Sequence, residues 1–235
     1  MNTSVRRIQA ILVKDYKEFS RNIAVSSMIF LPLILAAFYA RMGVDTIPGY
    51  FMSINITFSI VCTYVQCCLI AEEKEKNTLR SLMLSPASTS EILIGKSALT
   101  FISTMAIVAG CMYLSGYMPG NLALMALALI LSSFFYIAVG SFLGLFAKSV
   151  MESSVIVLPV LGIFSLGPTA MNFVESYPIL KILAWLPSSQ IIILGEILEN
   201  SFTFGEIVKP FVVIIGWIVI AAIATVVTFK KRMVD

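Results

Sequence analysis

The sequence predicts an all-α integral membrane protein: six transmembrane helices, an amphipathic N-terminal helix in the membrane interface, and short broken outer helices before the last span. Of the 235 residues, 59% are hydrophobic and only 12% are charged, with a mean hydropathy of +0.96, whereas soluble domains carry about 25% charged residues. Apolar runs of the ~20 residues that cross ~30 Å of hydrocarbon recur along the chain. In lipid, a helix satisfies its own backbone hydrogen bonds.

The expected spans are residues 22–40, 50–71, 92–116, 122–147, 154–170 and 209–229, and they make residues 1–235 a single transmembrane domain. Basic residues cluster on the cytoplasmic side of membrane proteins. The residues predicted to lie on that side are Arg6, Arg7, Lys14, Lys17, Arg21, Lys74, Lys76, Arg80, Lys96, Lys148, Lys230, Lys231 and Arg232, against Arg41, Lys181 and Lys209 on the other. This asymmetry predicts a multi-pass protein of the cell membrane with both termini in the cytoplasm.

Residues 1–21 have the pattern of an amphipathic helix. The apolar face carries Val5, Ile8, Leu12, Tyr16 and Phe19, and the opposite face carries Arg6, Arg7, Lys14 and Lys17. A basic face suits the anionic cytoplasmic leaflet, so membrane lipid is one expected partner. Docking of this helix on protein instead of lipid is the open alternative.

Residues 171–208 contain two short apolar pieces, Ile179–Leu186 and Ile191–Leu198, interrupted by Pro178, Pro187 and several charges. A seventh full crossing here would move the basic residues 230–232 to the outside. The segment is therefore expected to form two short re-entrant helices at the outer leaflet, broken at Pro187, where proline removes a backbone donor.

The loop of residues 72–91 is the most informative segment. Its first half, Glu72–Leu84, predicts a short amphipathic helix with an i,i+4 pair of Glu72 and Lys76. Pro86 ends this helix, and Ser88 with Glu91 forms a capping box in front of the third span. A charged helix in a connection that needs only a few residues indicates contact with a partner, and a solvated charge run is the alternative.

The loop resembles the permeases of the ABC type-2 transporter family in the order Glu-Lys-Glu-Lys-x-Thr-Leu, Leu-x-Leu-Ser-Pro-x-Ser and Glu-Ile-Leu-x-Gly-Lys. The family often has glycine where this chain has Asn77. The resemblance implies an exporter in which Glu72–Leu84 is a coupling helix seated in a separate cytoplasmic ATP-binding subunit. That subunit would hold the ATP and Mg, and a second permease chain, identical or related, would complete the pore. The implied ATPase-subunit interface is Glu72, Glu73, Lys74, Glu75, Lys76, Thr78, Leu79 and Leu82.

Polar side chains inside the spans are sparse and give candidates for a translocation path. They are Asn55, Thr57, Thr63, Gln66, Thr100, Ser103 and Thr104. No charge lies deep in a predicted span, which favours a hydrophobic or amphipathic cargo such as a drug, lipid or peptide over a cation relay. The alternative is that these hydroxyls bond to helix carbonyls.

Gly140 and Gly144 form a GxxxG pattern in the fourth span. Such a pair lets another helix approach closely, either inside the chain or at a subunit interface.

The sequence indicates no enzyme, metal site, bound cofactor or nucleic-acid partner for this chain. Histidine is absent, and all four cysteines lie in apolar runs. Gly95-Lys96-Ser97 lacks the earlier glycine of a Walker A motif, because residue 90 is serine. The rival classes are a membrane enzyme and a secondary transporter or channel without an ATPase, which would need inverted repeats or ionisable sites at the midplane.

Overall fold

A computed structural model describes residues 3–78, 87–200 and 202–232, and over these ranges the chain is helical with no strand. Six helices are long and apolar enough to cross a membrane: Ile23–Arg41, Ile47–Glu75, Glu91–Ser115, Leu122–Phe146, Val150–Phe173 and Phe204–Phe229. The predicted all-helical membrane fold with six spans is confirmed. An additional bent pair would raise the number of crossings to seven if it counted as one span.

Several spans are built from more than one helical piece. The N-terminal helix is α1 (Thr3–Arg21); the first span joins α2 (Ile23–Ser27), η1 (Met28–Phe30) and α3 (Leu31–Arg41); the second joins α4 (Ile47–Thr57), η2 (Phe58–Tyr64) and α5 (Val65–Glu75). The third span is α7 (Thr89–Ser115) and the fourth is α8 (Leu122–Phe146). The fifth joins α9 (Val150–Ile156), α10 (Leu158–Leu161), η3 (Gly162–Leu166), α11 (Gly167–Ala170) and η4 (Met171–Phe173), and the last is α13 (Phe204–Arg232).

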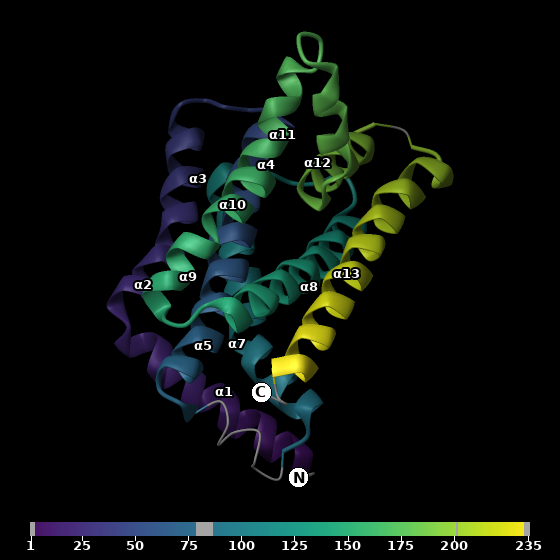
Figure 1. The fold of residues 1–235 in the computed structure, drawn as a ribbon. Helices are drawn as coiled ribbons and strands as arrows, with labels where there is room; N and C mark the ends of the chain where they lie inside the picture. The colour runs from purple at the N-terminus through teal and green to yellow at the C-terminus, as the bar shows by residue number, and fades with distance from the viewer. Residues whose placement is uncertain (1–2, 79–86, 201, 233–235) are drawn as a thin grey trace.

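The bundle has two distinct ends. Helix α1 lies across one end, which also receives the last turns of α13, and we call this the basal end (Figure 1). The opposite end, here the distal end, carries the turn after α3 and the connection between α11 and α12 (Pro187–Leu198) (Figure 1).

The second span forms the centre of the bundle. Its most apolar window is 89% buried, against 17–44% for the other five spans. Phe58 stacks on Tyr136 of α8 at 5.0 Å between ring centroids, and Phe135, Phe164 and Trp217 pack around this pair. The span runs through a π-helical segment, η2, and such segments are common at functional sites.

The glycine pair of α8 serves packing inside the chain. A Cβ on Gly140 would lie 2.5 Å from the carbonyl oxygen of Thr63, and one on Gly144 would lie 2.9 Å from that of Cys67. Because each contact is made with the second span, the first of the two interpretations of this motif holds.

The chain breaks sharply before α12, as the prolines predict. Helix η5 (Pro178–Trp185) meets α12 at 82°, with Leu186 extended between them. Ser189 Oγ and Gln190 Nε2 donate to carbonyls of η5 at 2.7 and 2.5 Å, and these bonds hold the corner.

The connection between the second and third spans agrees only in part with the sequence analysis. The capping box of Ser88 and Glu91 is present at the start of α7. However, the predicted continuous helix Glu72–Leu84 is wrong. Its first four residues belong to α5, which ends at Glu75, and Asn77 then adopts a left-handed conformation with φ of 55°. Asparagine tolerates this conformation after a helix end. Residues 79–86, including Leu79 and Leu82, lie outside the described residues.

Candidate functional site

Helix α1 docks on the bundle through one narrow face. Ile11 on this face is buried against Gly95 of α7, where an added Cβ would lie 2.9 Å from the Ile11 side chain. Val5 and Tyr16 are exposed and face away from the bundle. Docking on protein, the alternative to a purely lipid-bound helix, therefore describes the Ile11 face, and Gly95 serves helix packing.

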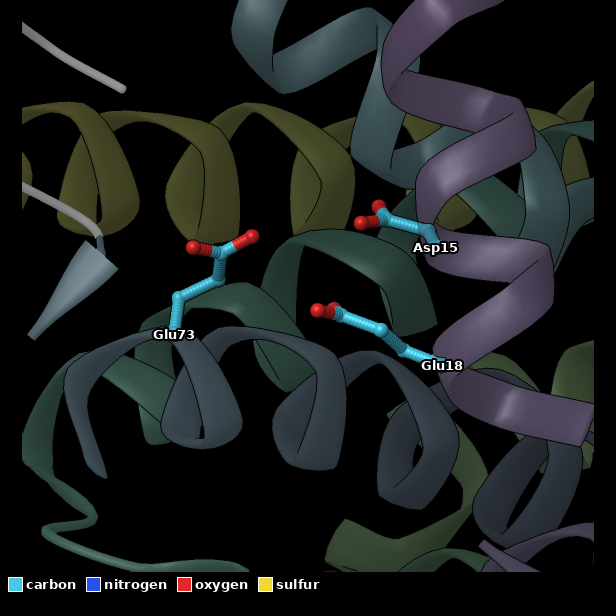
Figure 2. Close-up of side chains that lie close together, drawn as sticks. All are labelled: Asp15, Glu18 and Glu73. Atoms are coloured by element: carbon cyan, nitrogen blue, oxygen red, sulfur yellow. The ribbon is translucent and has the colours of Figure 1, made fainter. Parts of the chain in front are cut away.

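A buried charge cluster lies one turn further along the same face of α1. Asp15 from α1, Glu73 from α5 and Lys96 from α7 are each 0–2% exposed. The Lys96 ammonium lies 3.3 Å from Asp15 Oδ1 and 3.0 Å from Glu73 Oε1, so it joins both carboxylates. Figure 2 shows Asp15 and Glu18 of α1 pointing toward Glu73 of α5. We call Lys14, Asp15, Glu73 and Lys96 the charge cluster.

Lysines close the cluster on its outer side. Lys14 forms an ion pair with Glu73 and lies 3.6 Å from Glu18. Lys76 bridges Glu18 at 3.5 Å and Glu72 at 2.6 Å. Three helices that are far apart in the sequence are thus tied together by charge-assisted contacts, which are the stronger class of hydrogen bond.

The pKa values of Asp15 and Lys14 are both raised, but for different reasons. Burial raises the pKa of Asp15 to about 6 even though Lys96 and Lys14 oppose this rise. Asp15 Oδ2 has no hydrogen-bond partner among the described residues. For Lys14, burial alone would lower the pKa, but the Glu73 carboxylate outweighs it and the pKa is raised.

Three carboxylates of this region have the spacing of a cation site. Oxygens of Asp15, Glu18 and Glu73 lie within 4.8 Å of one another. The ammonium groups of Lys14 and Lys96 already contact these carboxylates. The arrangement is therefore that of an ion-pair cluster whose cations are supplied by the chain itself.

Three residues of the predicted ATPase-subunit interface make contacts within the chain. Glu73 is buried in the charge cluster. Lys74 Nζ donates to the carbonyl oxygens of Leu145 and Ala147, both at 2.7 Å, at the end of α8. Glu75 accepts from the backbone N–H of Val150 at 3.0 Å, at the start of α9. The expectation that Glu73 lies on an exposed helix is wrong, because its carboxylate is buried in ion pairs with Lys96 and Lys14.

The rest of that predicted interface is placed differently. Glu72 and Lys76 pair with each other near the surface, and Thr78 donates to the Glu73 carboxylate. Leu79 and Leu82 lie outside the described residues.

The predicted path residues are packed between helices. Six of the seven are at most 1% exposed, and Ser103 is half-buried. Gln66 accepts from Thr100 at 2.7 Å and donates to Ser141 at 3.0 Å, which links three spans. The hydrogen bonds of the other hydroxyls go to backbone carbonyls: Thr57 to Ser53, Thr63 to Tyr136 and Thr104 to Thr100. The carbonyl-bonded alternative thus describes these three threonines.

Asn55 differs from the other path residues. It lines a cavity of about 360 Å³ at the distal end, between α4, α11 and α12. Its side chain is 1% exposed, and neither its Oδ1 nor its Nδ2 has a hydrogen-bond partner among the described residues. A buried amide without partners costs about 1–3 kcal/mol, so this group is poised to bond to something else.

Sequence reasoning missed the residues that complete both places. Asp15 and Glu196 are not among the residues that the sequence singled out, and Lys96 was included as a basic residue of the cytoplasmic side. Glu196 lines the cavity. One signal was present: Ile8, Ile11 and Asp15 follow helical spacing on one face, and an acid on an apolar face needs a buried partner.

The fold and these contacts define a polytopic helical membrane protein with a mainly apolar core and a charged basal end. The chain belongs to the family described as membrane protein of 12 TMs, whose model matches residues 3–150. No curated protein matches the chain.

The family assignment corrects the resemblance to ABC type-2 permeases, which was wrong. The matching family is a different one, and no ABC family matches. Residues of the motif contact other parts of this chain: Glu73 pairs with Lys96, Lys74 donates to carbonyls at the end of α8, and Glu75 accepts from the start of α9.

Proposed function

We propose that the chain is a transport subunit that moves a hydrophobic or amphipathic substrate outward across the cell membrane. ATP hydrolysis on a separate cytoplasmic subunit, which holds the ATP and Mg, drives the movement. The basal end then faces the cytoplasm, in keeping with the excess of basic residues on that side.

The observation that carries the proposal is the charge cluster. Lys96 of α7 is held by Asp15 of α1 and Glu73 of α5. A displacement of α1 or of the end of α5 therefore pulls on α7. Helix α7 in turn bonds to the bundle centre through Thr100 and Gln66. Force applied at the basal surface has a direct route into the spans.

The cluster also supports two alternative arrangements, which a switch requires. One ammonium serves two carboxylates, and Asp15 Oδ2 is without a partner among the described residues. Ion pairs can exchange partners as helices slide, whereas a packed apolar contact fixes one geometry. The groups near the charge cluster that are at least partly exposed, Glu72, Glu75 and Lys76, are the proposed contact for the ATPase subunit.

Substrate character follows from where charge is buried. The buried charged side chains of the described spans and of α1 are Asp15, Glu73, Glu91 and Lys96, all at the basal end. Toward the distal end the buried core is mainly apolar and its polar side chains are uncharged, which suits an amphipathic molecule better than a small inorganic ion. Two copies of the chain, or one copy with a related chain, would bring together twelve spans, the number in the family's description.

A second candidate is a proton-coupled transporter without an ATPase. The buried Asp15 carboxyl favours it, because its raised pKa of about 6 lies close to cytoplasmic pH.

One experiment separates the two candidates. Inside-out vesicles are prepared from native-host membranes with and without the chain, and uptake of a lipophilic fluorescent dye is measured. The ATPase proposal expects uptake with ATP that a non-hydrolysable analogue does not support and a protonophore leaves unchanged. Uptake that the protonophore abolishes in the presence of ATP favours the second candidate, and equal uptake in both preparations contradicts both.

A further inference from the structure

The residues that line the distal cavity offer three chemical features to a ligand. Its apolar lining includes Met52, Ile192 and Ile193. Its deep polar group is the amide of Asn55, and the carboxylate of Glu196 lies at its exposed side. A volume of about 360 Å³ lies in the range of sites for drug-sized molecules.

The deep wall is held in place by bonds that do not involve the Asn55 side chain. Ser165 Oγ donates to Ser59 Oγ at 2.8 Å and lies 3.3 Å from the Asn55 carbonyl oxygen. The backbone of Asn55 is thereby fixed while its side-chain amide stays without a partner among the described residues. A ligand with a hydrogen-bonding group recovers the free energy that this buried amide loses.

The mouth of the cavity favours positive charge. Glu196 forms no ion pair with any described residue. A second hollow continues outward from Glu196 and Ile193 to Glu206. The carboxylates of Glu196 and Glu206 therefore flank the approach, and an anionic ligand would be repelled.

We propose that this cavity binds an amphipathic cation. The amine or other cationic group lies at Glu196, the apolar body lies against Met52, Ile192 and Ile193, and a hydrogen-bonding group reaches Asn55. As the substrate site of transport, the cavity rests on the proposed function; binding itself is measured without transport.

The test uses the full chain in lipid nanodiscs and two probes of the same shape and opposite charge. Binding of labelled tetraphenylphosphonium and of tetraphenylborate is measured by equilibrium dialysis, with protein-free nanodiscs subtracted. The cation is expected to bind saturably and the anion is not. Saturable binding of both probes with equal affinity, or of neither, overturns the proposal.

Variants locate the binding. Glu196→Gln keeps the side-chain shape at an exposed position and should weaken cation binding about fivefold, the upper range for an exposed ion pair. Glu199→Gln is the matched control, because Glu199 is exposed on the same helix but does not line the cavity, and it should leave binding unchanged. Equal weakening by both substitutions means general attraction at the surface and overturns the site.

The amide is tested with a third probe. Rhodamine 6G is a cation with hydrogen-bonding amines, whereas tetraphenylphosphonium has no such group. Asn55→Leu should weaken rhodamine 6G binding about fivefold and leave tetraphenylphosphonium binding unchanged. Equal effects on the two probes contradict the role of the amide.

Failure of this inference is distinguishable from failure of the proposed function. Binding with the expected variant pattern but no ATP-dependent uptake in vesicles contradicts transport alone. ATP-dependent uptake that Glu196→Gln leaves intact, together with unchanged binding, contradicts the cavity alone.

Discussion

The basal charge cluster and the distal cavity lie at opposite ends of the same bundle and differ in how their polar groups are satisfied. At the basal end, Lys96 holds two buried carboxylates and further lysines close the cluster. At the distal end, Asn55 is as deeply buried, yet its amide has no partner among the described residues. The first arrangement ties helices together, and the second leaves an unmet bond beside open space. We infer from this difference that the charge cluster holds helices together and that the cavity is a binding site.

The largest effect is expected from removing Lys96, the central cation of the charge cluster. Lys96→Met leaves Asp15 and Glu73 buried without their shared partner, which should destabilise the fold by about 3–5 kcal/mol. Thermal unfolding in detergent measures the loss. Lys17→Met, at an exposed position of α1, is the control and should change little. A loss for Lys96→Met no greater than that of the control would mean that the cluster does not hold the helices.

The next effect is a dependence on pH that belongs to Asp15. Its folded pKa of about 6 lies above the ordinary 3.8, so the folded state binds this proton more tightly than the unfolded state. Stability should therefore rise as pH falls from about 7 toward 4. A pKa difference of about 2 corresponds to at most about 3 kcal/mol.

Asp15→Asn isolates this contribution, because the groups that face Asp15 stay in place: Lys14, Lys96 and Glu73. Unfolding midpoints of the variant and of the unaltered chain should converge as pH falls through 6. Parallel curves over the whole range would show that Asp15 does not titrate there.

A smaller effect is expected at the contact between the second and fourth spans. Gly140→Ala places a methyl group 2.5 Å from the Thr63 carbonyl oxygen and 2.9 Å from Gln66, so the helices must separate. The expected cost is about 1–3 kcal/mol. Gly216→Ala on α13 has no atom within 4 Å of the added carbon and serves as the control. Equal unfolding midpoints for the two variants would contradict the packing role of the motif.

The smallest effect is expected at Lys76, on the exposed edge of the charge cluster. Lys76 is half-exposed, and its pairs with Glu18 and Glu72 are screened by water, so Lys76→Ala should cost less than about 1 kcal/mol. Unfolding midpoints at low and high salt check this, since the difference from the unaltered chain should shrink with salt. A loss of stability as large as that of Lys96→Met would mean that the exposed pairs of Lys76 stabilise the fold as much as the buried charge cluster does.

The spans and the break at Pro187 could be predicted from the sequence because the membrane imposes them. A helix must be long and apolar to cross, and a proline after a short apolar piece ends it. The capping box of Ser88 and Glu91 was also predictable, since it depends on four adjacent residues. These features are local.

The charge cluster was not predictable, because it depends on how helices are placed against each other. Asp15 and Lys96 are 81 residues apart and meet only because Ile11 seats α1 against Gly95. Glu73, Lys74 and Glu75 form a run that resembles a solvated surface. Successive helical residues point about 100° apart, so each of the three meets a different partner.

The most direct test of the charge cluster replaces its buried charges with apolar side chains of similar size. Asp15→Leu, Glu73→Met and Lys96→Met together remove the buried charges, while the partly exposed Lys14 keeps its contact with Glu18 at 3.6 Å. Such replacements often preserve stability. ATP-dependent uptake of rhodamine 6G into inside-out native-host vesicles is then compared for the unaltered chain, the triple variant and vesicles without the chain. The account predicts that the triple variant remains folded but takes up no more dye than vesicles lacking the chain. Uptake by the triple variant equal to that of the unaltered chain, or no uptake by the unaltered chain, would contradict it.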